Sequence, residues 1–530
     1  MKKIFFGVLK IFLGTLLLFV FLEAICFLGG IPRGADRFIE CIIIREKLSA
    51  HKPKGEVRVF TYGESTMHGA HYAPYSSPAR WLSVYLKDFL PDRKIRVINF
   101  SRMGHDSSFV YRAARDTLAY RPDVCIFYTG HNELLPGNLV SDVAARQSTF
   151  SYKAREWVRS SRLLSLAYRL ALRHRAQRKG ESFEDTMELK SIERQPTVFV
   201  DQANLTYRNT PAYKDNILYF KQMLSDILAL GKKTNVPLFF FKPGSNLKDF
   251  SPTYSLHIKT LTPEVLSRWN FFYEEGQKAQ AKADLKVARN FYEKAYALDD
   301  SHAELSFRLG KIYFKDGDLQ KARNFFEQAR DNDGFVVRAT TDILDVFEGL
   351  RKTHDLKLIE TEKILSAEAP GGILGEPMIE DNVHPSVKAQ SLMGRAAAQE
   401  IADENWIAPR SEWKFDRERP FEEIVKELGV GPDVLFMADL KMVFYFGSRF
   451  ENRLRFAKKA LELKPHSPPA LRHLAWTYWL MGEKDQALEI YRHLYQVDPA
   501  AFQTALKNQA DIKDSYEKKF NVLLNPRHDL

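Results

Sequence analysis

Cysteine is scarce in this chain, whose 530 residues include only Cys26, Cys41 and Cys125. No two of them have the spacing of metal ligands, and no disulfide framework can be read from three thiols. The cysteines therefore do not decide which compartment the protein occupies. We expect no metal and no cofactor.

Nucleic-acid-binding patterns are also missing, because no zinc-finger, RNA-recognition or helix-turn-helix motif occurs in the sequence. The formal charge is +11, from 78 Lys and Arg against 67 Asp and Glu. This excess is spread along a long chain, which favours weak attraction to anionic membranes or glycans over a nucleic-acid partner.

What the chain does contain is enough apolar sequence for several packed domains. Apolar residues make up 45% of the chain and charged residues 27%, which is typical of globular proteins. A length of 530 residues predicts two to four domains.

The N-terminus carries a mostly apolar run from Ile4 to Ile31, interrupted by Lys10 and Glu23. A membrane-spanning helix needs about 20 apolar residues, so this run is long enough. No Ala-x-Ala site follows, which favours an uncleaved signal-anchor over residues 4–31; a cleaved signal peptide is the alternative. We predict a single-pass membrane protein whose remaining residues are extracytoplasmic, on the periplasmic side if the cell is Gram-negative.

Residues 32–55 contain several prolines and glycines and are expected to form a stalk. Apolar runs then alternate with helical stretches through 55–260 and 335–403, which indicates a parallel sheet covered by helices on both faces. Strands are predicted at 57–62, 95–100, 124–128, 236–241 and 356–359, and helices at 79–89, 107–120, 213–230 and 387–401.

A repeat separates the last two predicted strands. Small and aromatic residues recur with the 34-residue period of tetratricopeptide repeats, from Gly276 to Gly310. A second, more degenerate pair follows near the C-terminus. Repeats are therefore predicted at 266–333 and 430–505, and their stacked hairpins suit a protein partner. Plain helical packing without a partner is the alternative.

Arginine and leucine dominate residues 152–179, a pattern typical of a basic amphipathic helix. Two interpretations stay open for it. The helix can pack on the domain as a solvated insertion, or it can lie on the membrane surface near the anchor.

Four short blocks with chemically useful side chains each follow a predicted strand or precede the last helix. They contain Ser65 in Gly63-Glu64-Ser65, then Gly104, Asn132, and finally Asp381 with His384. A serine hydroxyl needs a base to accept its proton, and His384 oriented by Asp381 suits that task. The N–H groups of Ser65 and Gly104 and the Asn132 amide are suitable donors to an oxyanion.

These blocks, in this order, resemble the SGNH/GDSL hydrolase superfamily, and more narrowly a bacterial membrane-anchored subgroup with tetratricopeptide repeats. The resemblance implies a three-layer, flavodoxin-like α/β domain, with one set of helical repeats inserted and another C-terminal. It implies that Ser65 is the nucleophile, Asp381 and His384 complete the triad, and Ser65, Gly104 and Asn132 form the oxyanion hole. Glu64 stands where the general motif has Asp.

The sequence thus predicts a serine esterase or deacylase acting on an ester, such as O-acyl groups of envelope glycans or lipids. The residues that bind the substrate are not readable. An O-acyltransferase with the same triad is an alternative, since only the acyl acceptor differs. A membrane-tethered repeat scaffold with a vestigial hydrolase domain is another.

Overall fold

The computed structural model describes residues 2–34, 36–140, 150–179, 205–354, 356–447, 449–507 and 509–520. They form two compact units. The first comprises Met1–Ala70 and Ser77–Arg419, and the second comprises His71–Ser76 and Pro420–Leu530. Each unit is described by itself.

A five-stranded parallel sheet organises the first unit, in the order β2-β1-β3-β4-β5. The strands are β1 (Glu56–Gly63), β2 (Lys94–Asn99), β3 (Val124–Tyr128), β4 (Leu238–Lys242) and β5 (Lys357–Glu360). This is the flavodoxin-like order, in which ligands bind beyond the carboxyl ends of the strands. The predicted α/β fold class is confirmed.

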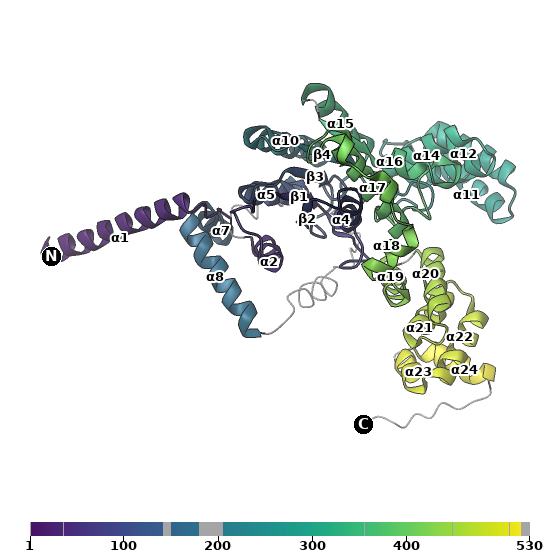
Figure 1. Cartoon of the computed structure of the whole chain (residues 1–530). Helices are drawn as coiled ribbons and strands as arrows, with labels where there is room; N and C mark the ends of the chain where they lie inside the picture. The colour runs from purple at the N-terminus through teal and green to yellow at the C-terminus, as the bar shows by residue number, and fades with distance from the viewer. Residues whose placement is uncertain are drawn as a thin grey trace. The chain divides into compact units, whose positions relative to one another are not determined.

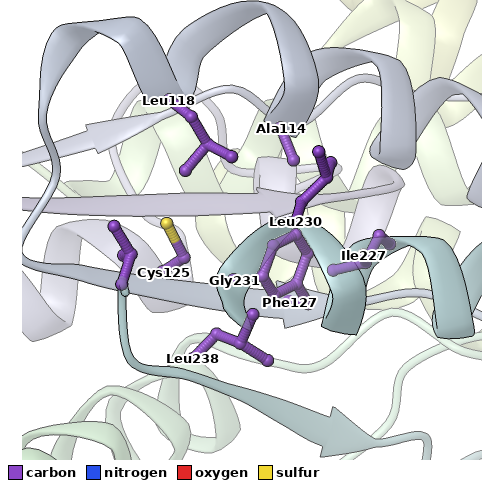
Figure 2. Close-up of a pocket in the computed structure, with 9 residues that line it drawn as sticks. Ala114, Leu118, Cys125, Phe127, Ile227, Leu230, Gly231 and Leu238 are labelled. Carbon is purple, nitrogen blue, oxygen red and sulfur yellow. The ribbon is translucent and has the colours of Figure 1, made fainter. Parts of the chain in front are cut away.

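One face of the sheet is covered by α5 (Ser107–Thr117), α10 (Pro211–Thr234) and α15 (Thr341–His354), seen around the strands in Figure 1. Aromatic rings stack across this face from Tyr62 to Phe127 and on to Phe240, with 4.9 Å between neighbouring centroids. A small apolar gap among α5, β3, α10 and β4, lined by residues such as Leu118, Phe127 and Ile227, belongs to the same core (Figure 2).

The opposite face carries α4 (Pro78–Phe89), α16 (Thr361–Ser366) and α17 (Val387–Asp403). Helix α17 approaches α4 closely because Gly394 has no side chain. A Cβ at that position would lie 2.6 Å from the Trp81 Cβ and 2.8 Å from the Leu82 nitrogen. The domain is therefore closed by helices on both faces, as the alternating sequence pattern predicted.

The segment after the N-terminal helix α1 (Lys2–Leu28) is not a stalk, so that expectation is wrong. It forms α2 (Arg37–Arg45), capped at its start by the Asp36 carboxylate. Ile39, Ile42 and Ile43 of this helix are buried in the same core as α5 and the sheet. The prolines and glycines here mark turns around a packed helix.

The region 152–179 is two helices and not one: α7 (Phe150–Ser160) and α8 (Arg162–Lys179). Between β4 and β5 the chain forms two helical hairpins, α11 (Pro263–Ala281) with α12 (Leu285–Leu298) and α13 (Ala303–Lys315) with α14 (Leu319–Asp331). Gly276 and Gly310 let the rings of Tyr292 and Phe326 pack against their helices, since a Cβ would lie within 2.6 Å of each ring.

The second unit is helical. Its helices are α18 (Phe421–Leu428), α19 (Pro432–Tyr445), α20 (Phe450–Leu463), α21 (Pro468–Leu480), α22 (Lys484–Val497), α23 (Pro499–Leu506) and α24 (Ala510–Phe520). Successive helices from α19 to α22 pack as antiparallel neighbours around buried alanines, including Ala457, Ala475 and Ala487. This packing agrees with the predicted second set of repeats.

Candidate active site

Ser65 lies just beyond the carboxyl end of β1, as the first residue of the short helix α3 (Ser65–His68). Gly63 makes this turn possible because it lies beside Tyr128 of β3, and Met67 of α3 packs against it. A Cβ on Gly63 would lie 2.5 Å from the Tyr128 carbonyl oxygen and 2.7 Å from the Met67 Cβ. The glycine of the Gly-Glu-Ser block is thus required by close packing.

Ser65, His384 and Asp381 form one hydrogen-bonded row, although the sequence separates them widely. The Ser65 Oγ lies 2.7 Å from the His384 Nε2, and the His384 Nδ1 lies 2.5 Å from the Asp381 Oδ2. All three residues are buried, with Ser65 8% and His384 7% exposed. A serine, an imidazole and a carboxylate in this order can move a proton from the hydroxyl to the ring.

The Asp381 carboxylate is held in place by the backbone of its own turn. Its Oδ1 accepts the N–H groups of Val383 at 2.9 Å and His384 at 2.7 Å, which leaves Oδ2 for the imidazole. The loop is fastened further by Asn246, which donates from its side chain to the Ile379 carbonyl at 3.1 Å. Asp381 is therefore fixed before any substrate arrives.

Gly104 and Asn132 lie in adjacent loops that a hydrogen bond joins. The Asn132 Nδ2 donates to the His105 carbonyl oxygen at 2.9 Å, which leaves the second amide hydrogen for another acceptor. Gly104 has a φ of 69°, a left-handed conformation that favours glycine, and no atom lies within 4 Å of a Cβ placed there. The left-handed backbone is therefore what favours glycine here, since a Cβ would have room.

Buried carboxyl groups lie behind the Asn132 loop. The Glu64 Oε1 accepts the Thr129 hydroxyl at 2.5 Å and the Gly130 N–H at 2.9 Å. Glu133 accepts the N–H of Ser107 at 3.0 Å and contacts its hydroxyl at 2.7 Å. Burial raises the pKa of Glu64 to about 7. Burial and the nearby Glu64 carboxyl raise the pKa of Glu133 well above its ordinary value.

The buried His131 holds the same loop against the segment that follows the inserted repeats. The Ala339 N–H donates to its Nδ1 at 3.1 Å, so the ring proton is on Nε2, which lies 3.0 Å from the Tyr128 hydroxyl. Burial and, second to it, the neighbouring His384 lower the pKa of His131 to about 3. His131 is thus a neutral structural histidine.

Asn99, at the end of β2, is a residue whose role the sequence did not reveal. Its Nδ2 donates to the Met67 carbonyl at 2.8 Å, and its Oδ1 accepts the Thr61 hydroxyl at 3.0 Å and the Ser101 N–H at 3.1 Å. It therefore ties α3, which carries Ser65, to the loop that leads to Gly104. Its place near the end of the predicted strand 95–100 was the one available signal.

Comparison with known proteins gives matches for different parts of the chain. Tetratricopeptide-repeat family models match residues 279–335 and 469–500, which confirms repeats in both predicted regions. No curated protein matches the chain. A solved GDSL-like lipase from Bacteroides thetaiotaomicron is similar at 10% identity and a TM-score of 0.31, over 69% of this chain and 100% of that chain. A tetratricopeptide-repeat protein of Thermus thermophilus is similar at 13% identity and a TM-score of 0.13, over 48% of this chain and 100% of that chain.

Proposed function

We propose that this protein is a membrane-anchored, extracytoplasmic serine esterase or deacylase that works through an acyl-enzyme on Ser65. The observation that carries the proposal is the buried row of Ser65, His384 and Asp381, with 2.7 Å and 2.5 Å between successive polar atoms. Its position beyond the carboxyl end of β1 is where a sheet of this order binds ligands.

In the reaction that we propose, His384 Nε2 takes the proton of the Ser65 hydroxyl as Oγ bonds to the acyl carbon. The Nδ1 proton of His384 stays hydrogen-bonded to Asp381, which stabilises the imidazolium. The imidazolium then gives its Nε2 proton to the leaving alkoxide oxygen, and the ester bond breaks. Water, deprotonated by the same nitrogen, next attacks the acyl-enzyme. The bond between the Ser65 Oγ and the acyl carbon then breaks, the imidazolium returns its proton to Oγ, and the carboxylic acid is released.

The tetrahedral intermediates carry a negative oxygen, for which we assign the N–H groups of Ser65 and Gly104 and the free amide hydrogen of Asn132. One preorganised donor contributes about 3–4 kcal/mol to the transition state. The hydrogen bond from Asn132 to the His105 carbonyl supports this role, because it fixes the amide before the oxyanion forms.

Helix α1 is proposed as the anchor. Its segment Leu9–Leu28 is long and apolar enough to cross a membrane. The substrates we propose are O-acyl groups on envelope glycans or lipids, and the two sets of repeats are proposed to bind a protein partner. A reporter that is active only outside the cytoplasm, fused after residue 530, should be active; a silent fusion would place the catalytic domain inside the cell.

The test of the reaction is covalent labelling by a fluorophosphonate probe, followed by hydrolysis of short p-nitrophenyl esters. The wild type should be labelled and active, and Ser65→Ala should lose both. Ser225→Ala, which removes an exposed hydroxyl on α10, is the matched control and should keep both. A wild type with neither labelling nor turnover, whose repeats nevertheless capture a partner, would support the scaffold interpretation instead.

A further inference from the structure

Helix α1 has one acidic side chain within its apolar stretch Leu9–Leu28, and that side chain is engaged. The Glu23 carboxylate accepts the Arg162 N–H at 2.7 Å, the Leu163 N–H at 3.0 Å and the Ser161 hydroxyl at 2.9 Å. The N–H groups of a first helical turn have no partner within their own helix. Glu23 thus caps the start of α8, and its charge faces the positive end of that helix.

A second contact fastens the same turn to the end of α1. The Arg162 guanidinium lies over the Phe27 ring, 5.1 Å from its centroid, and donates to the Ile31 carbonyl at 2.5 Å. Figure 1 shows α8 running across the end of α1 and not back along it. Helix α8 is therefore attached at one fixed point of α1.

The position of Glu23 sets the depth of that point. Glu23 lies five residues before Leu28, the end of the apolar stretch, and the helical rise is about 1.5 Å per residue. The first turn of α8 is consequently within about 8 Å of the end of the apolar stretch. For a bilayer crossed by α1, this is the depth at which surface helices bury their apolar side chains.

The faces that α7 and α8 leave open are of mixed apolar and basic character. Trp157 is 63% exposed on α7, with the exposed Lys153 one turn before it. Leu170 is 53% exposed on α8, with exposed Arg173 and His174 one turn later. Residues three or four apart share a helix face. Exposed tryptophan and leucine beside basic residues are typical of helices that lie at a membrane surface.

Among the described residues, the acidic side chains beside α7 and α8 are already paired, including Glu156 of α7 with Arg159 at 2.5 Å, and this leaves the open faces positive. Asp36 binds Arg159 at 3.1 Å, and Glu40 binds Arg169 at 2.9 Å, with both partners of the second pair buried. These pairs also lock the hairpin to the chain just after α1. The remaining charge on the open faces attracts an anionic surface.

We propose that α7 and α8 form a membrane-surface hairpin that seats on anionic phospholipid headgroups beside the anchor. Trp157 and Leu170 enter the boundary between headgroups and acyl chains, and Lys153 and Arg173 contact the lipid phosphates. This inference rests on the proposed membrane anchor, because it needs α1 to cross the bilayer.

The test uses the full chain in liposomes whose phosphatidylglycerol carries bromine near the headgroup, a short-range quencher of tryptophan. Emission of Trp157 is obtained as the difference between wild type and Trp157→Phe. We expect this emission to be quenched, and we expect α1 to hold the protein on the liposomes through a carbonate wash. Retention without quenching would overturn the hairpin and leave the anchor intact. Release of the protein by the carbonate wash would refute both the membrane anchor and the hairpin.

The lipid charge is tested in mixtures of phosphatidylcholine with brominated phosphatidylglycerol. In Lys153→Gln and Arg173→Gln, the phosphatidylglycerol fraction that gives half-maximal quenching should rise about fivefold for each charge removed. Lys232→Gln with Lys233→Gln, at exposed positions near the end of α10, is the matched control and should not shift it. Equal quenching by brominated phosphatidylcholine would overturn the assignment to anionic lipid.

Discussion

Replacing Asp381 with asparagine tests whether His384 must hold its proton on Nδ1. The Asp381 Oδ1 accepts two backbone N–H groups, from Val383 at 2.9 Å and His384 at 2.7 Å, whereas Oδ2 faces the His384 Nδ1. If the asparagine placed its NH₂ group at the position of Oδ1, the two buried backbone N–H groups would face a donor instead of an acceptor. Each unsatisfied buried donor costs about 1–3 kcal/mol, so we expect the oxygen to stay with the backbone.

The amide NH₂ then points at the His384 Nδ1 and forces the ring proton onto Nε2. That nitrogen, 2.7 Å from the Ser65 Oγ, can no longer accept the hydroxyl proton. The expected loss is about 10⁴-fold in kcat, as in other serine triads whose aspartate becomes asparagine. This corresponds to about 5.5 kcal/mol in the activation barrier.

The assay is the turnover of a p-nitrophenyl ester by purified full-length protein, with the thermal midpoint measured in parallel. Asp381→Asn should keep the midpoint near that of the wild type, because the amide has the shape of the carboxyl group. Asp215→Asn, at an exposed position on α10, controls for loss of a charge. A folded Asp381→Asn with kcat within tenfold of the wild type would refute the proton assignment.

Three further changes test the surroundings of Ser65. Gly63→Ala should lower the free energy of unfolding by about 1–3 kcal/mol in urea titrations, because its Cβ would overlap the Tyr128 oxygen; Gly349→Ala, in open space on α15, should not lower it. Asn132→Ala should lower kcat about 10²–10³-fold if its amide binds the oxyanion, and an unchanged kcat would remove it from that role. Burial raises the pKa of Glu64 from 4.5 to about 7, so the folded chain holds this proton to higher pH than the unfolded chain, and stability falls as pH rises across that window. In Glu64→Gln, the free energy of unfolding should fall by up to about 3 kcal/mol less across this pH window than in the wild type. Identical pH profiles of the unfolding free energy in the two proteins would contradict the shift.

The sheet could be predicted from the sequence because each strand is a local signal. Buried parallel strands appear as short apolar runs, and all five predicted runs are strands, shifted by at most two residues at either end. The fourth begins at Leu238 and not at Val236, since Pro237 has no N–H to donate. The 34-residue period was equally local, and the repeats were found by it.

What the sequence could not reveal depends on contacts between distant segments. The helix expected over 152–179 breaks before Arg162 because Glu23, far away in the chain, caps the new helix start. The expected stalk folds because its isoleucines find a core supplied by later residues. Asn99 and Glu64 gain their partners only when the strand ends meet. That Ser65, Asp381 and His384 lie together could be predicted because their blocks occur in the order found in the family that the sequence resembles.

The packed segment between α1 and the sheet limits how far the proposed catalytic domain can move from the proposed anchor. A flexible tether of 24 residues, the length first expected for 32–55, would allow excursions of about 25–30 Å. Helix α2 has Ile39 and Ile43 in the core and therefore holds the domain close to the end of α1. For a chain anchored as we propose, Ser65 then stays at one height above the bilayer. Encounters with substrate become a two-dimensional search, and only esters presented at that height are within reach.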